Sequence, residues 1–161
     1  MIAGITADTN FENNEDKSWL KDSFHKAILQ YHITEGFTSL SPGPDQLFAS
    51  VLSELGIPFT VVIPADNYHN TFKDPSFRAS FFALLMQSKD IIKLPHSNDI
   101  EEQSMLEMGK FMVRSSQIIL SVNDNGQKES EDMANKVISY AHLLGKTVIN
   151  ISPECRKAEI V

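Results

Sequence analysis

The sequence predicts an α/β fold with a mostly parallel sheet of about six strands and helices on both faces. Short apolar runs and longer amphipathic segments alternate strictly along the chain, which is the pattern of right-handed strand–helix–strand crossovers. The run PFTVVIP is continuously apolar, as a strand covered on both faces is. The chain has 161 residues, 42% of them hydrophobic, which is enough to bury one core. Together these observations predict a single Rossmann-like, doubly wound domain.

The first half of the chain contains three strand-like runs separated by two helical segments. The first helical segment repeats apolar side chains at helical spacing. In the second, Pro44 suits the first helical position and Gly56 suits the C-terminal cap. We therefore expect helices at 16–30 and 41–55, and strands at 1–6, 36–40 and 58–64.

The second half continues the alternation with three more helices and three more strands. A phenylalanine-rich segment, FRASFFALLMQ, has helical length and a wide apolar surface, and Gly145 suits the end of the last helix. We expect helices at 77–87, 100–115 and 130–144, and strands at 90–95, 117–122 and 147–152. No linker or repeat divides the chain, so we expect one ligand-binding domain over residues 1–152 and a short C-terminal tail over 153–161.

The charge pattern limits the partners. The formal net charge is −7, and the 14 basic residues are scattered among 21 acidic ones, which disfavours nucleic acid as the main partner. No apolar run approaches the roughly 18 residues of a membrane span, so no membrane partner is expected. Cys155 is the single cysteine and cannot form an internal disulfide, and the five histidines lack metal-binding spacing. We expect a cytoplasmic protein without a zinc site.

In an open parallel sheet, ligands bind at the carboxyl ends of the strands. The loop SPGPD offers Ser41 and a glycine, Gly43, before a helix whose free N–H groups attract an anion. Asp45 follows in the first turn and could bind a ligand or instead cap the helix end itself. The capping interpretation is the simpler of the two, and both remain open at this point.

Two other loops on this edge carry polar or aromatic side chains. Ala7 and Asp8 follow the first strand, where a carboxylate could hold a ribose hydroxyl or simply form a turn. Pro64 ends the third strand, and Tyr68 and Arg78 follow it. An aromatic ring and a guanidinium could stack a base and bind an anion, although core packing or a subunit contact explains the aromatic residues equally well.

The loop after the fifth strand is acidic. It contains Asp124, Gly126, Ser130 and Glu131, with Ser130 a plausible cap for the last helix. Such a loop is a poor site for a phosphate unless a divalent cation intervenes. A solvated acidic loop is the simpler interpretation, and a hydroxyl-binding or cation-bridged site is the alternative. No other cofactor is expected, and no residue is assigned a catalytic role.

The segments GITAD, SPGPDQLFA, VVIPADNYHNTFKD and GKFMVRSSQIILSVNDNG, followed by ANKVISYAHLLGK, resemble the SLOG superfamily, the SMF/DprA and Lonely Guy group of Rossmann-like domains. The resemblance matches Gly43 and Asp45 to a glycine–x–aspartate motif. It matches Pro64, Tyr68 and Phe72 to a strand end followed by an aromatic-rich loop. It also matches Arg78 to a downstream arginine and Gly109 to a glycine before the fifth strand. It implies binding of nucleotides or nucleotide-derived signals, often in dimers or larger assemblies.

The sequence also departs from this group. Glu131, Asp132 and Met133 stand where the group has a Gly-Gly-Thr phosphate loop. Lys136 stands where the hydrolase branch has a glutamate, and an ammonium cannot stabilise an oxocarbenium-like centre as a carboxylate does. The resemblance therefore favours a pocket that reads ribose and base over one that holds a polyphosphate.

These observations predict binding or sensing of a nucleotide or nucleotide-derived small molecule at the strand ends. The alternative is a hydrolase or transferase acting on an N-glycosidic bond, with a carboxylate such as Asp8, Asp45, Asp124 or Glu131 near the anomeric carbon. A third possibility is an assembly module whose phenylalanine-rich helix supplies a subunit interface. We expect a homodimer or larger homo-oligomer.

Overall fold

The computed structural model describes residues 1–8, 13–95, 102–124 and 133–161. The strands are β1 (Ile2–Ala7), β2 (Glu35–Thr38), β3 (Phe59–Ile63), β4 (Asp90–Lys93), β5 (Ile118–Val122), β6 (Thr147–Ser152) and β7 (Lys157–Ile160). The helices are α1 (Asn14–Gln30), α2 (Pro44–Glu54), the 3₁₀ helix η1 (Tyr68–Thr71), α3 (Pro75–Gln87), α4 (Glu102–Ser115) and α5 (Met133–Leu143). The predicted α/β class and the alternating order of elements are confirmed.

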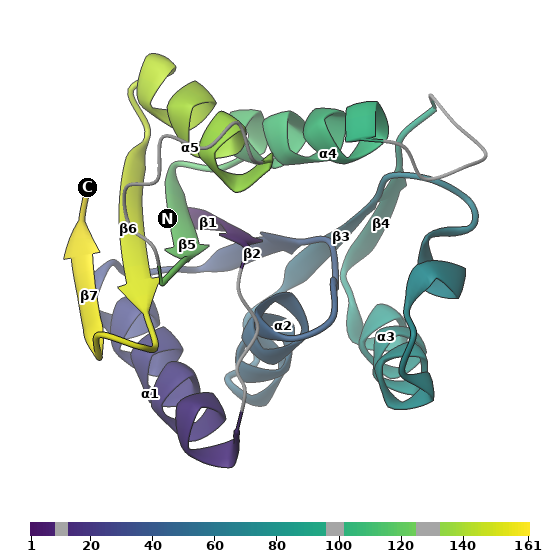
Figure 1. Cartoon of the computed structure of the whole chain (residues 1–161), viewed down its shortest axis with the longest axis horizontal. Coiled ribbons are helices and arrows are strands. Elements are labelled where there is room, and N and C mark those ends of the chain that lie inside the picture. Colours follow the sequence, from purple (N-terminus) through teal and green to yellow (C-terminus); the bar gives the residue numbers. More distant parts are fainter. Residues whose placement is uncertain (9–12, 96–101, 125–132) are drawn as a thin grey trace.

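One seven-stranded sheet in the order β4-β3-β2-β1-β5-β6-β7 forms the centre of the molecule. The first six strands pair in parallel, and β7 runs antiparallel to β6. Figure 1 shows α1, α2 and α3 on one face of the sheet and α4 and α5 on the other, as the doubly wound prediction requires. The carboxyl ends of the parallel strands consequently meet at one edge, where the loops to α1, α2 and η1 begin.

The two faces of the sheet bury separate cores. The larger core lies under α1, α2 and α3 and contains Phe24 and Phe48, whose rings meet edge to face at 5.4 Å between centroids. A smaller core under α4 and α5 contains Val113, Ile119 and Val137. Because both faces are covered, β5 is buried along its whole length, as its apolar sequence predicts.

Local signals set the helix boundaries close to their predicted positions. Pro44 and Pro75 occupy the first turns of α2 and α3. The side chain of Asn13 accepts a hydrogen bond of 2.8 Å from the Asp16 N–H and caps α1, which therefore begins at residue 14 rather than 16. Gly56 follows α2 with a φ of +68°, the left-handed conformation expected after a helix.

The C-terminal segment differs most from the expectation. Residues 153–161, expected to be a tail, contain β7, which raises the number of strands from about six to seven. Arg156 at the turn before β7 has a φ of +53°, contacts Asp16 at 2.7 Å and lies over the Trp19 ring. These contacts with α1 hold the β6–β7 hairpin against the rest of the domain. No helix in the described ranges is long and apolar enough to cross a membrane.

Candidate functional site

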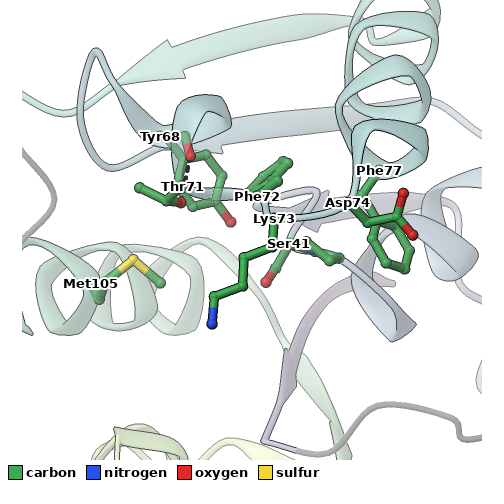
Figure 2. A pocket seen from close by; sticks show the side chains of 9 residues that line it. Ser41, Tyr68, Thr71, Phe72, Lys73, Asp74, Phe77 and Met105 are labelled. Atoms are coloured by element: carbon green, nitrogen blue, oxygen red, sulfur yellow. Dashed lines mark hydrogen bonds between the residues drawn. The ribbon is translucent and has the colours of Figure 1, made fainter.

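Two adjoining pockets lie at the carboxyl edge of the sheet, and both are lined by Ser41 and Met105. The inner pocket, about 270 Å³, lies between the ends of β1 and β2, the first turn of α2, and the helices α4 and α5. The outer pocket, about 430 Å³, lies beside η1 and the start of α3. Figure 2 shows the outer pocket, with Tyr68 and Phe72 on one side and Met105 across from them. Spaces of this size suit a small organic ligand.

A buried chain of polar side chains connects the two pockets. The Tyr68 hydroxyl donates to Ser39 Oγ at 3.3 Å, and Ser39 Oγ donates to Asp45 Oδ2 at 2.8 Å. Asp45 is 4% exposed. Burial raises the pKa of its carboxyl from 3.8 to about 7, although hydrogen bonds from the Ser39 side chain and backbone partly offset this effect. Asp45 can therefore hold or release a proton near neutral pH.

Of the two interpretations of Asp45, the structure does not support the one in which its side chain caps α2. Gly43 occupies the N-cap position with a φ of +95°, and among the described residues no side-chain hydrogen bond caps this helix end. The Asp45 carboxyl instead points to Ser39 in the loop after β2. The reason is that Gly43 and Pro44 turn the chain so that Asp45 lies inside the first turn, facing the strand ends rather than the helix terminus.

The loop after β2 is fixed by Gln46, whose role the sequence did not reveal. Its side-chain amide donates to the Leu40 carbonyl at 3.1 Å and to the Phe77 carbonyl at 3.0 Å. Leu40 is held at a φ of +56°, an unusual conformation for a residue other than glycine. The two hydrogen bonds join the loop to the first turn of α3. A glutamine inside an amphipathic helix carries no sequence signal for this function.

Methionine side chains form the wall of the inner pocket that faces the strand ends. Four contribute, from α4 and from the first turn of α5: Met105, Met108, Met112 and Met133. Thr6, Ser39, Ser41 and Asp45 line the same pocket and bring three hydroxyls and one carboxyl to it. This wall was not predicted, although the spacing of residues 105, 108 and 112 places three of the methionines on one helix face.

Several predicted site residues meet at these pockets. Ala7, Asp8, Ser41 and Asp45 line the inner pocket, and Ser41 and Tyr68 line the outer one. Position 7 is an alanine, so its side chain offers no hydrogen bond. The ring of Tyr68 packs against Phe72 and Phe81, as the core-packing interpretation predicts, and its hydroxyl joins the polar chain. Stacking of this ring on a base stays a prediction.

Other predicted residues lie elsewhere. Gly43 lines a separate groove between α1, α2 and α3. Pro64 is buried, and neither it nor Arg78, in the first turn of α3, lines one of the two pockets. Among the described residues that line the two pockets, Lys73 is the one cation. Figure 2 shows its side chain extending into the open part of the outer pocket.

The acidic loop after β5 is only partly described. Asp124 Oδ1 accepts hydrogen bonds from the Ser152 hydroxyl at 3.1 Å and from the Glu154 N–H at 2.8 Å, and so holds the β6–β7 turn. Gly126, Ser130 and Glu131 lie outside the described residues. Within the part of the chain that is described, His, Cys, Asp and Glu side chains form no cluster that could hold a metal ion. A divalent cation at this loop stays a prediction.

No family model and no curated protein sequence matches the chain. Solved structures do share its fold. A single-stranded-DNA-binding DNA processing protein A from Helicobacter pylori aligns with a TM-score of 0.64 and 10% identity over 93% of this chain and 64% of that one. DNA processing protein A from Streptococcus pneumoniae aligns with a TM-score of 0.62 and 9% identity, covering 92% of this chain and 49% of that one.

The chain thus spans about half the length of the pneumococcal protein. A molybdenum cofactor binding protein from Rippkaea orientalis aligns with a TM-score of 0.59 and 12% identity, covering 94% of this chain and 76% of that one. At these identities the likeness is one of fold. The expected Rossmann-like fold is confirmed: the chain shares the fold of the DNA processing protein A structures.

Proposed function

We propose that this domain binds a nucleotide-derived small molecule, with its aromatic base in the inner pocket. The observation that carries the proposal is that four methionines line one pocket together with three hydroxyl-bearing residues and the Asp45 carboxyl. Thioether sulfurs contact aromatic rings favourably and adapt to their shape. Hydroxyl and carboxyl oxygens bind the ring nitrogens and sugar hydroxyls of a nucleoside. The molybdenum cofactor binding protein supports small-molecule binding by this fold.

The charge of the site narrows the ligand class. Lys73 and Asp74 line the outer pocket, and Asp8 and Asp45 line the inner one. One ammonium neutralises a single negative charge, and the carboxylates oppose more. A nucleoside or a nucleoside with one phosphate or phosphodiester therefore suits the described residues better than a triphosphate. The base and sugar would occupy the inner pocket, and the charged group would extend toward Lys73.

The experiment is a thermal-shift screen followed by titration calorimetry with nucleosides, nucleoside monophosphates, cyclic nucleotides and ADP-ribose derivatives. At least one of these compounds should raise the melting temperature. Met105→Ala should then weaken binding about tenfold, because the contact between the Met105 side chain and the base is lost. Met86→Ala is the matched control, since Met86 is 88% exposed on α3. A screen in which no compound shifts the melting temperature would contradict the proposal.

The second candidate is cleavage at an N-glycosidic bond. Asp45 favours it, because a carboxyl with a pKa of about 7 can donate and accept a proton at neutral pH. Incubation of the protein with nucleosides and nucleoside monophosphates, followed by chromatography, separates the two candidates. Free base that disappears in Asp45→Asn would indicate an enzyme. Retention of intact ligand would indicate a binding module.

A further inference from the structure

The β7 strand leaves one edge of the sheet open. Figure 1 shows it at the end of the sheet, next to β6. All four of its residues are exposed, and no described strand pairs with its outer side. The Ile160 side chain is 62% exposed. An open strand edge is a template for pairing with another strand.

The hydrogen bonds of β7 with β6 determine which backbone groups point outward. Val161 N–H donates to the Val148 carbonyl at 3.0 Å, one step beyond the register that pairs Ile160 with Ile149. The direction of the backbone N–H and C=O groups alternates from one residue of a strand to the next, so those of Glu159 and Lys157 also point toward β6. Ala158 and Ile160 therefore present their N–H and C=O groups to the outside.

We propose that β7 pairs antiparallel with β7 of a second copy of this chain, about a two-fold axis at Ala158. In such a pair the two-fold axis must pass beside a residue that faces its own copy. In any other register, a residue whose N–H and C=O groups point outward would face one whose groups point back to β6, and no hydrogen bonds could form between them. In the register centred on Ala158, Lys157 faces the partner's Glu159, and the same contact recurs on the other side of the axis. The Ala158 backbone groups of the two copies then exchange two hydrogen bonds.

Charge selects this register over its neighbours. A register centred on Lys157 places two ammonium groups opposite each other, and one centred on Glu159 does the same with two carboxylates. Like charges directly opposite each other destabilise a sheet, and opposite charges stabilise it. Within one chain Lys157 already lies 2.6 Å from Glu159. In the dimer the four side chains form a ring of alternating charge, at the non-hydrogen-bonded positions where facing strands are closest.

The opposite edge of the sheet does not have this pattern. There β4 reads Asp90, Ile91, Ile92, Lys93, with Lys89 just before it. A register centred on Ile91 places Lys89 opposite Lys93, and one centred on Ile92 pairs Asp90 with an apolar residue. Neither register forms ion pairs, and lysines are a common protection of edge strands. The self-complementary sequence is particular to β7.

Sedimentation velocity of the whole chain over a range of concentrations tests the proposal. The wild type should show a reversible monomer–dimer equilibrium that weakens as salt is added. Lys157→Glu and Glu159→Lys should each raise the dimer dissociation constant about tenfold or more, because both facing pairs become like-charged. The double variant, Lys157→Glu with Glu159→Lys, should restore the dimer. A mixture of the two single variants should form a heterodimer.

Two further variants complete the design. Ala158→Pro removes an outward N–H and should abolish the dimer, while circular dichroism and the melting temperature show a folded monomer. Lys89→Glu makes the same charge change at the far edge of the sheet and should leave the dimer unchanged. A wild type that stays monomeric at every concentration overturns the proposal. So does a dimer whose dissociation constant none of the β7 variants alters.

Discussion

Among single residues, Asp45 has the chemistry that depends most on its surroundings. Its carboxyl is buried at the strand ends and hydrogen-bonded to Ser39, and its pKa is raised to about 7. A free aspartate would be ionised at this pH. The folded protein therefore binds a proton that the unfolded chain releases above pH 3.8.

This difference predicts a pH dependence of stability. A raised native pKa means that the native state binds more protons than the unfolded state between about pH 4 and 7. Over that window the free energy of unfolding should fall as pH rises, by about 4 kcal/mol in total for this group. Asp45→Asn lacks the titration, so the difference between wild type and variant should shrink or reverse toward pH 7. Urea unfolding of both proteins across this range measures it, and a pH-independent difference would contradict it.

The sequence could predict the location of Asp45 but not its function. The glycine and proline before it indicate a helix start at the strand ends, and that position is confirmed. Its hydrogen-bond partner, Ser39, comes from the loop after β2, and Tyr68 joins the chain from η1. A pattern of nearby residues contains no information on which distant hydroxyl will lie within 3 Å. For the same reason Gln46 was not recognised.

At the level of elements, the approach of α4 to α5 shapes the inner pocket. Gly109 lies on α4 against Val137 of α5, and a Cβ added at Gly109 would overlap Val137 Cγ2. Residues of both helices line the pocket. The missing side chain thus lets the two helices come close enough to close the methionine wall.

A double-mutant cycle tests this contact. Gly109→Ala should lower the free energy of unfolding by about 1–3 kcal/mol, the usual cost of overpacking a core. The cost should be smaller in a Val137→Ala background, because the methyl groups that it meets are gone. Chemical denaturation of the four proteins gives the coupling. Equal costs in both backgrounds would show that the two helices do not meet at Gly109.

Long periodic elements were predicted well and the last short one was not. Capping residues and prolines mark the ends of α1, α2 and α3, so their boundaries follow from local chemistry. The sequence KAEI of β7 has four residues and one strongly apolar side chain, which gives no strand signal by itself. It becomes a strand because β6 offers it an edge and because Arg156 is held by α1.

At the scale of the whole molecule, charge separates this chain from the DNA-binding protein whose fold it shares. It carries 21 acidic and 14 basic residues, and binding to nucleic acid depends mainly on basic side chains that contact phosphates. We expect no measurable binding of a fluorescent single-stranded oligonucleotide at physiological salt in an anisotropy titration. Saturable binding that weakens steeply with salt would contradict this expectation and indicate a basic surface.

The two hydrogen bonds of Gln46 have a consequence for how fast a ligand binds. They join the loop after β2 to the start of α3, on either side of the outer pocket. These walls cannot separate unless the buried Gln46 amide loses one of its two hydrogen bonds, so we expect them to be ordered before any ligand arrives. The conformational entropy that is lost when these walls become ordered is therefore a cost of folding and not of ligand binding. The rate at which a ligand enters from this side should then depend on its diffusional encounter with the opening, and not on a slow conformational change.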